Sequence, residues 1–477
     1  MIGYVILGLV AAFFTVILIR AALFTPKPQK GIETGGISFD KDRAVETLQA
    51  LVRCKTVSYN DPQLEDDAEF EKLVAMLPDL YPRVFDVCKL KRLPGRALLL
   101  RWPGKNDQAP TVLMAHYDVV PVDESAWEKP AFEAVIEDGV MWGRGTLDTK
   151  ATFNAALSAA NHLIARGFVP EQDVYFAFSG GEEVNGKGAP NIVEYFREQG
   201  IVPALVLDEG GAVVQGVFPG VKEPCALIGI AEKGMINAQY TVHSAGGHAS
   251  APPVKTPIGT LAKACRRILA KPFKLHITKP VAEMFDTLGR RSSFLYKVIF
   301  ANLWCFQWVL DLICRTGGGD MNALLRTTSA FTQMEGSNAR NVIPPVARLV
   351  ANMRLNPADT VESALEYLRQ VVNDPDVEIT ALESSEPSPI SETDCAAWDK
   401  VASAAASTWR GCVTAPYLMV QCSDSRHYGE ISNHVYRFSA MDLTTEERRT
   451  IHGHNERIRL ETIHKSVEFY IRLIKKC

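Results

Sequence analysis

Residues 111–118 read TVLMAHYD, a short apolar run that ends in a histidine and an aspartate. A run without polar alternation is typical of a parallel strand that is buried on both faces. Two further apolar runs end in a similar way, because residues 173–183 close with GGEE and residues 204–210 close with DEG. Helical patterns occupy residues 150–166 and 192–199 between these runs. The alternation predicts an α/β domain with a doubly wound, mainly parallel sheet.

Histidine and carboxylate side chains follow the ends of these strands. Because the carboxyl ends of parallel strands line one crevice, we expect His116, the Glu182–Glu183 pair and Asp208 to lie close together. Asp148, just before the helical pattern at residues 150–166, adds another carboxylate. So many negative charges in one place require a cation. Imidazole and carboxylate ligands without thiolate favour zinc, with manganese or cobalt as alternatives.

The pattern changes after Gly234. The expected elements then follow the order β-α-β-β-α-β of the ferredoxin-like α+β unit. Their residues are 235–242, 256–269, 330–334, 347–354, 361–372 and 377–382. We therefore predict a catalytic domain at residues 38–233 and 385–477 and an inserted lid domain at residues 234–384, with an apolar insertion at residues 271–328.

Two apolar stretches need a separate interpretation. Ile2 to Ile19 carries no charge and is long enough for about 27 Å of helix, close to the thickness of a hydrocarbon core. No basic residue precedes this stretch, as one would in a cleaved signal peptide, so we expect a membrane anchor at residues 1–25. Phe294 to Cys314 contains Lys297 and Asp311, which are costly in lipid, and this predicts a buried or groove-lining helix.

Composition excludes several classes of protein. The 477 residues include 51 Lys plus Arg and 55 Asp plus Glu, so the net charge is −4 and no basic surplus favours nucleic-acid binding. The ten cysteines contain no C-x-x-C pair, which argues against a thiolate zinc site or a small disulfide scaffold. Residues 181–187 match G-x-x-x-x-G-K, but Gly188 replaces the hydroxyl residue of a phosphate-binding loop. Neither G-x-S-x-G nor H-E-x-x-H occurs.

An ordered set of motifs resembles a known family. The motifs are HYDVVP at 116–121, GRGTLDTK at 143–150, GEE at 181–183, GHAS at 247–250, NVIP at 341–344, DSR at 424–426 and HGHNE at 452–456. This set resembles the co-catalytic di-zinc metallopeptidases, a family that includes aminoacylase, carboxypeptidase S and succinyl-diaminopimelate desuccinylase. It is most similar to the carboxypeptidase S branch, which includes enzymes that make and cleave N-fatty-acyl amino acids.

The resemblance implies a role for individual residues. The metal ligands that it implies for two zinc ions are His116, Asp148 as the bridge, Glu183, Asp208 and His452, with His454 left open as the last ligand. Glu182 would be the general base, and Asp118 would orient the imidazole of His116. His248 would stabilise the oxyanion. The substrate-binding residues that it implies are Asn341, Arg354 and Arg426.

The resemblance also implies a reaction. We expect a zinc-dependent hydrolase that cleaves the amide bond to a C-terminal amino acid by attack of a metal-bridging hydroxide. It would be a carboxypeptidase or an N-acyl-amino-acid amidohydrolase, and its substrate would carry a free carboxylate. We expect an apolar acyl group for a separate reason, because the apolar stretch Phe294–Cys314 lies beside the lid and the anchor would place the enzyme near lipid. The alternatives are an aminopeptidase or dipeptidase on the same fold, and a non-catalytic membrane-tethered binding protein. The second alternative would be expected to lack Glu182 or a metal ligand, and none is lacking.

Assembly and location are also predicted. A homodimer through the lid would let His248 act in the partner's active site, because the Gly246–Gly247 pair gives its loop reach. In a monomer, the apolar insertion could supply that contact. The basic residues Arg20, Lys27 and Lys30 follow the apolar run Ile2–Ile19, which favours a cytoplasmic catalytic domain. Relatives in the branch that the chain resembles are lumenal or secreted, and we therefore expect the extracytoplasmic side.

Overall fold

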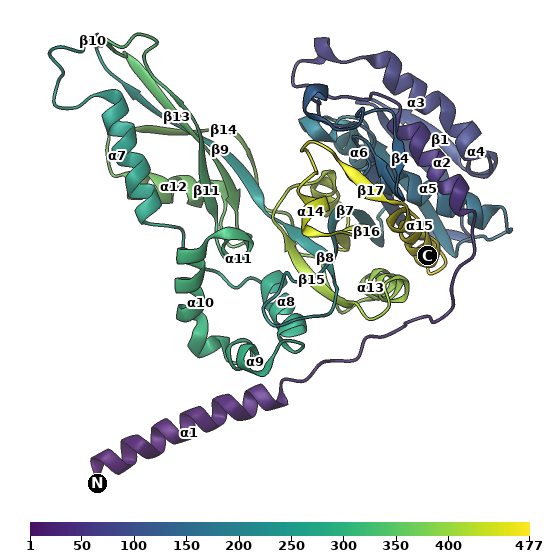
Figure 1. Cartoon of the computed structure of the whole chain (residues 1–477), viewed down its shortest axis with the longest axis horizontal. Helices are drawn as coiled ribbons and strands as arrows, with labels where there is room; N and C mark the ends of the chain where they lie inside the picture. The colour runs from purple at the N-terminus through teal and green to yellow at the C-terminus, as the bar shows by residue number, and fades with distance from the viewer.

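The computed structural model describes all 477 residues, and its largest element is an eight-stranded mixed sheet (Figure 1). In spatial order the strands are β1 (Lys89–Leu93), β2 (Ala97–Trp102), β6 (Gln172–Ser179), β3 (Asn106–His116), β7 (Leu205–Val214), β16 (Val435–Asp442), β8 (Cys225–Glu232) and β15 (Val413–Met419). The β6–β3, β3–β7, β7–β16 and β8–β15 pairs are parallel. This sheet confirms the predicted α/β class with a mainly parallel arrangement.

Helices cover both faces of this sheet. One face packs against α3 (Asp67–Leu80), α4 (Pro82–Val87), α5 (Lys150–Ile164), α13 (Ala396–Thr408) and α15 (Leu460–Ile474), and the other packs against α6 (Gly188–Glu198). α2 (Lys41–Val52) lies against α5 at one side. Along β3, Leu113 and Ala115 enter the first core, whereas Val112 and Met114 enter the second. Burial on both faces is the reason that this strand is apolar without alternation.

The second unit is a four-stranded antiparallel sheet in the order β11 (Thr328–Glu335), β13 (Val346–Leu355), β9 (Gly234–His243) and β14 (Glu378–Ser385). α7 (Pro257–Ala270) and α12 (Val361–Val372) share one core with this sheet. In the chain the elements run β9-α7-β11-β13-α12-β14, which is the predicted ferredoxin-like order. The two-stranded pair β10 (Gly247–His248) and β12 (Val342–Ile343) forms its outer tip. The residue boundaries assigned to the domains stay a prediction.

A smaller sheet and a short helix lie beside the central sheet. The sheet consists of β4 (Val135–Glu137), β5 (Val140–Trp142) and β17 (Arg457–Arg459), and α14 (Thr445–Arg448) precedes β17. The pairing of β17 with β5 brings the C-terminal HGHNE motif next to the loop that carries Asp148. Two motifs more than 300 residues apart in the sequence therefore meet at one place.

The insertion forms four helices, α8 (Lys279–Gly289), α9 (Phe294–Phe300), α10 (Leu303–Gly317) and α11 (Gly319–Leu325). Phe285 and Phe300 pack with Val413 and Leu418 of β15, so the insertion covers the edge of the central sheet. The expectation of one buried or groove-lining helix over residues 294–314 is wrong, because α9 and α10 meet at 105° and their outer faces are exposed. Some apolar residues of these two helices are buried and others lie on the exposed outer faces. The composition of the stretch does not distinguish the two groups.

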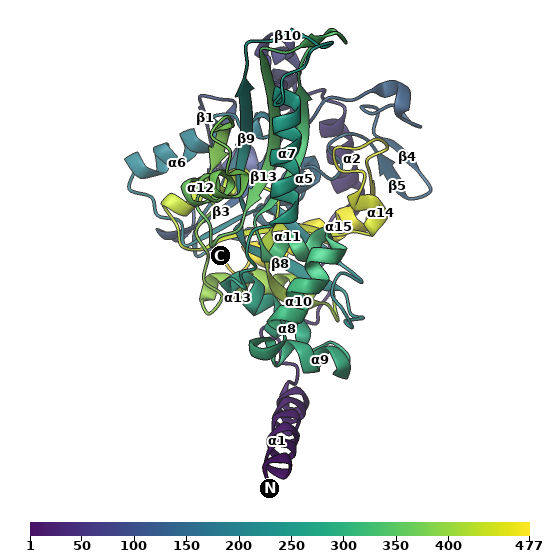
Figure 2. The ribbon, with the colours of Figure 1, turned by 90° about the vertical axis from the view of Figure 1, so that its left-hand side faces the viewer.

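The N-terminal helix α1 (Ile2–Leu23) projects from the rest of the molecule (Figures 1 and 2). Its most apolar window has a mean hydropathy of 2.7 and is 6% buried, so α1 is long and apolar enough to cross a membrane. Its C-terminal end contacts the insertion, where the Arg20 guanidinium donates to the Ala301 carbonyl at 2.9 Å and the Asn302 amide donates to the Ile17 carbonyl at 3.1 Å. The predicted apolar helix is therefore present and is attached to the insertion.

Candidate active site

The end of β3 is tied to the turn after β6 through Asp118. The His116 imidazole is buried, and its Nδ1 lies 3.0 Å from the Asp118 backbone oxygen and 3.4 Å from the Asp118 carboxylate. The same carboxylate accepts the backbone N–H groups of Glu182 and Glu183, each at 3.2 Å. Asp118 therefore fixes both the ring and the paired glutamates, which agrees with the orienting role that the resemblance implies.

Asp148 lies between two imidazoles. Its Oδ1 is 2.9 Å from His116 Nε2, and its Oδ2 is 2.9 Å from His452 Nε2. A glutamate accompanies each imidazole, because Glu209 Oε1 lies 3.4 Å from His116 Nε2 and Glu183 Oε2 lies 3.1 Å from His452 Nε2. The arrangement has the form of two adjacent ligand sets that share one bridging carboxylate. The sequence left open whether His452 or His454 is the last ligand. In the structure, the imidazole next to Asp148 and Glu183 is that of His452.

The structure brings Glu209, and not Asp208, to His116. Asp208 pairs in register with Arg437 of β16, but the next aligned pair is Gly211 with Phe438, so Glu209 and Gly210 form a bulge in β7. Asp208 points the other way, and its Oδ2 accepts the Ser425 backbone N–H at 3.0 Å. Asp208 is the first acidic residue after the apolar run at residues 204–207, which is why the sequence pattern favoured it. Neighbouring residues of a strand point to opposite faces, so that choice could not be made from the sequence.

Glu456 supports the loop that carries Asp148, a contact that the sequence did not single out. Its buried carboxylate accepts from Arg144 Nη1 at 2.6 Å and from the backbone N–H groups of Leu147 at 2.7 Å and Asp148 at 3.2 Å. These bonds fix the turn that presents Asp148 to the two imidazoles. The HGHNE motif contains Glu456, but a buried glutamate that holds a loop has the same sequence signal as a ligand.

The charges of the cluster are strongly coupled. Burial opposes the ionised form of Asp148, yet the hydrogen bonds from His116 and His452 hold its pKa well below the usual range. Hydrogen bonds to Asp148 and Glu183 raise the pKa of His452 to about 10. Burial raises the pKa of Glu182 well above its usual value. Without a cation, protons must neutralise part of this cluster.

The donor set fits a divalent metal. Two groups of three residues each offer ligand atoms that lie within 4.8 Å of one another. The first group is His116, Asp148 and Glu183, and the second is His116, Glu182 and Glu209. Oε1 of Glu183 is buried and has no hydrogen-bond partner, as expected for an oxygen that a cation would satisfy. The remaining donors are imidazole nitrogens and carboxylate oxygens, the ligands that zinc takes in catalytic sites.

The expected substrate-binding residues fall into two groups. The Arg426 guanidinium donates to Asn185 Oδ1 at 2.9 Å, two residues after Glu183, and Arg354 of the lid donates to Cys422 Sγ at 3.2 Å in the loop after β15. His248 and Asn341 instead lie together at the outer tip of the lid, joined by the bond from the Ala249 N–H to the Asn341 carbonyl. Figure 1 shows that β10 is at the end of the lid furthest from the central sheet, so one chain does not bring His248 to the cluster.

Known proteins are similar to this chain in sequence and fold. The chain matches peptidase family M20/M25/M40 over residues 112–476. It is 36% identical over 442 residues to N-fatty-acyl-amino acid synthase/hydrolase PM20D1 of Xenopus tropicalis, covering 91% of this chain and 86% of that protein. It is 34% identical over 451 residues to Probable carboxypeptidase S-like 2 of Dictyostelium discoideum, covering 92% and 86%. The M20 family metallo-carboxypeptidase Sso-CP2 from Sulfolobus solfataricus has a similar fold, with a TM-score of 0.66 and 17% identity over 91% of this chain and 98% of that one.

The contacts of Glu456 generate a prediction. We expect Glu456→Ala to lower bound metal and kcat/KM about 10- to 100-fold, because Asp148 loses its support. The substitution also leaves the buried guanidinium of Arg144 without its carboxylate partner, which should destabilise the protein by about 3–5 kcal/mol. Metal analysis and thermal unfolding measure both effects. The matched control is Glu446→Ala, whose ion pair with Arg457 is at the surface and should contribute at most about 1 kcal/mol. Equal metal content and equal Tm in the two variants would contradict this role.

Proposed function

The chain belongs to peptidase family M20/M25/M40, and from that premise we propose a mechanism for its site and a class of substrate. It is a metal-dependent exopeptidase or amidohydrolase that cleaves the amide bond to a C-terminal amino acid. We propose that the preferred substrate is an N-acyl amino acid with a free carboxylate and an apolar acyl group. The names of the relatives support this class, since one is an N-fatty-acyl-amino acid synthase/hydrolase and another a probable carboxypeptidase S-like protein. The observation that carries the chemistry is Asp148 between two imidazoles.

Two zinc ions are proposed as the cofactor. One would be held by His116, Asp148 and Glu209, and the other by His452, Asp148 and Glu183, with cobalt or manganese as possible substitutes. When bound, such a pair acidifies a water molecule and polarises the scissile carbonyl. Glu209 thus replaces Asp208 in the proposed ligand set, because its oxygen is the one that faces His116.

Glu182 is proposed as the general base and acid. Its carboxylate lies in the group with His116 and Glu209, where it can take the proton of the attacking water. It can then hold that proton and deliver it to the leaving amine. Asp118 keeps the Glu182 backbone in place through the bond to its N–H. The proton path therefore needs only one carboxylate of this chain.

Recognition of the free carboxylate is assigned to the arginines. A guanidinium fork binds a carboxylate through two parallel hydrogen bonds. Arg354 comes from the lid and Arg426 from the catalytic unit, and both lie near loops that border the cluster. Asn341 is proposed to bind the carbonyl oxygen of the substrate from the lid tip. An aminopeptidase would not need a carboxylate-binding arginine.

A homodimer through the lid is proposed to complete the site. His248 and Asn341 are exposed at the lid tip, away from the metal-binding cluster of their own chain. β11 is an edge strand of the lid sheet with a largely exposed surface, and such an edge can pair with a second copy. In this assembly, His248 of one protomer stabilises the oxyanion in the site of the other.

Location is proposed from α1. Its 22 residues would form a single-pass anchor, with the catalytic domain on the extracytoplasmic side. A membrane location suits substrates with a long acyl chain, because such substrates partition into lipid. The apolar surface of the insertion beside α1 supports an apolar acyl group.

The general base is tested first. Glu182→Gln should keep its metal but lower kcat about 10²- to 10⁴-fold, because the shape remains while the proton acceptor is lost. Amine release from a panel of N-acyl amino acids, with long-chain and acetyl groups, measures the effect. The same compounds with an amidated carboxyl group serve as the control for carboxylate recognition. A near-normal kcat in Glu182→Gln would refute the mechanism, and turnover of the amidated compounds at equal rates would refute the carboxylate requirement.

The choice between two adjacent acidic residues is tested by metal analysis. Glu209→Gln should bind one metal ion fewer per chain, because it removes a carboxylate that faces His116. Asp208→Asn should keep the full metal content, since Asp208 accepts a backbone N–H from Ser425 instead. Metal stoichiometry of the folded proteins measures the difference. The reverse pattern would restore Asp208 as the ligand.

Assembly is tested by complementation. Glu182→Gln and His248→Ala should each be inactive alone, whereas a mixture should regain a fraction of the normal activity. In mixed dimers one site receives an intact Glu182 from its own chain and an intact His248 from the other. Subunit exchange is verified with differently tagged chains. Exchange without recovered activity would show that His248 does not act between subunits.

A further inference from the structure

An aromatic surface lies on the outer side of the insertion. Its residues and their exposed fractions are Phe294 (54%), Leu295 (72%), Trp304 (60%), Trp308 (69%), Leu312 (56%) and Ile313 (56%). Trp304, Trp308 and Leu312 are four residues apart on α10 and therefore share one face of that helix. The opposite face holds Leu310 and Cys314, which are buried against the rest of the insertion. Soluble proteins rarely expose a contiguous apolar surface of this kind without a partner.

The aromatic surface is fixed beside α1. Asn302, at the junction of α9 and α10, is fully buried and bonds both to Arg20 and to the Ile17 carbonyl. The Phe13 and Trp304 rings pack edge to face with centroids 5.9 Å apart. The apolar exterior of α1 thus continues onto the aromatic surface, and whatever covers one is placed to cover the other.

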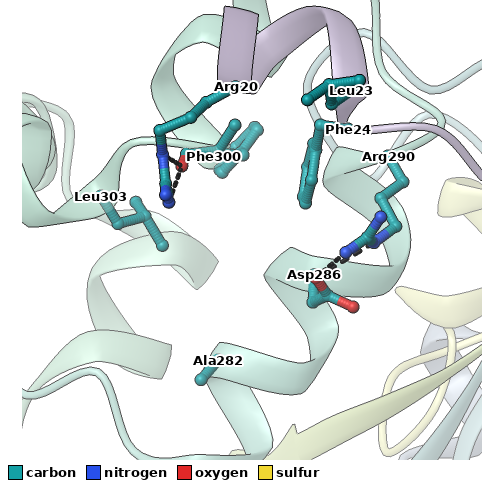
Figure 3. A pocket seen from close by; sticks show the side chains of 9 residues that line it. Arg20, Leu23, Phe24, Ala282, Asp286, Arg290, Phe300 and Leu303 are labelled. Carbon is teal, nitrogen blue, oxygen red and sulfur yellow. Dashed lines mark hydrogen bonds and ion pairs between the residues drawn. The ribbon is translucent and has the colours of Figure 1, made fainter. Parts of the chain in front are cut away.

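Charged side chains cluster around the C-terminal end of α1. Figure 3 shows Arg20 on one side of a cavity of about 460 Å³ and the Asp286–Arg290 ion pair on the other, with Phe24 and Phe300 among the apolar lining. These charges lie at the end of α1 where lipid headgroups are expected. Phe13 is seven residues before Arg20, about 10 Å along the helix. Trp304, packed on Phe13, therefore lies about as deep as interfacial helices lie in a bilayer, which is roughly 5–10 Å.

A basic strip lies on α7 and the segment that follows it. Lys263, Arg266, Lys271 and Lys274 are exposed, and none of them takes part in an ion pair. No acidic residue occurs between Lys233 and Ala282, although the whole chain is acidic. Figure 2 shows α7, α10 and α9 on the same face of the molecule, with α1 extending beyond them. The elements that carry the basic strip and the aromatic surface thus lie on the same side of the molecule.

We propose that this face rests on a phospholipid bilayer. The aromatic surface of α9 and α10 enters the boundary between headgroups and acyl chains, and the basic strip contacts anionic headgroups. Tryptophan favours this boundary, and lysine and arginine near a bilayer are attracted to its negative charge. The inference rests on the proposed anchoring by α1 and adds a second contact, which holds the catalytic unit and the lid in one orientation on the membrane.

Tryptophan quenching tests the aromatic surface. The full chain is reconstituted into phosphatidylcholine–phosphatidylserine liposomes, with bromine placed either high on the acyl chain or near its end. α1 contains no tryptophan, and the five tryptophans other than Trp304 and Trp308 lie outside the insertion. Lipid brominated high on the chain should quench the wild type severalfold more than the Trp304→Phe/Trp308→Phe variant. Equal quenching of the two proteins, or strongest quenching by bromine near the chain end, would overturn the proposal.

Flotation of the same liposomes separates this inference from the anchor. If the chain floats but its quenching does not depend on Trp304 and Trp308, the interfacial contact is overturned and the anchor stays intact. A chain that does not float overturns the anchor and, with it, this inference. A second copy of the chain on the aromatic surface would also protect Trp304 and Trp308 from the brominated lipid, so it belongs to the first of these outcomes.

The basic strip is tested with matched charge variants. Phosphatidylserine should increase the quenching of the wild type relative to phosphatidylcholine alone. Substitution of Lys263, Arg266, Lys271 and Lys274 by Gln should abolish this increase. The control replaces four exposed cations of the catalytic unit by Gln, at Lys41, Lys89, Lys105 and Arg166. A control variant that loses the increase to the same extent, or a strip variant that keeps it, would overturn the role of the strip.

Discussion

The position of Asp148 between two imidazoles is the constraint on which the rest of this structure depends. Its two oxygens must face His116 at the end of β3 and His452 near the end of the chain. These groups come from three distant segments, so the site exists only when the central sheet and the β17–β5 pairing are both formed. Glu456 fixes the turn by accepting the backbone N–H groups of Leu147 and Asp148. The fold therefore holds close together carboxylates that repel one another, and a cation lowers that repulsion.

Much of the fold was predictable because the strands of the central sheet are buried on both faces. The runs at β2, β3 and β6 have no polar alternation, and α12 begins and ends at the residues that the sequence pattern indicated, 361 and 372. β8 and β15 were not predicted, since their apolar runs are interrupted by glycine, proline and polar residues. Their pairing is determined by long-range contacts that no local pattern contains.

The candidate site was predictable to the level of segments and not to every side chain. Motif order placed His116, Asp148 and Glu183 in segments that the structure brings together. Asp208 and Glu209 are neighbours, and only the bulge in β7 determines which of them turns toward His116. The supporting role of Glu456 was also beyond the sequence, because four donors from a different segment define it. Residue type and order locate a site, whereas backbone register decides which atoms face it.

The insertion connects the C-terminal end of α1 to the junction between the two units. The buried ammonium of Lys233, between β8 and β9, donates to the carbonyls of Ala323 and Arg326 at 2.9 and 2.8 Å. Arg326 in turn donates to the Phe273 carbonyl after α7 and to Asp311 of α10. One network therefore joins the helix that carries Trp304, the lid and the link between the two sheets. A change in the angle between the lid and the catalytic unit must either break these buried bonds or move the insertion with it. Because buried hydrogen bonds to charged groups are costly to lose, contact of the insertion with a surface constrains the lid as well.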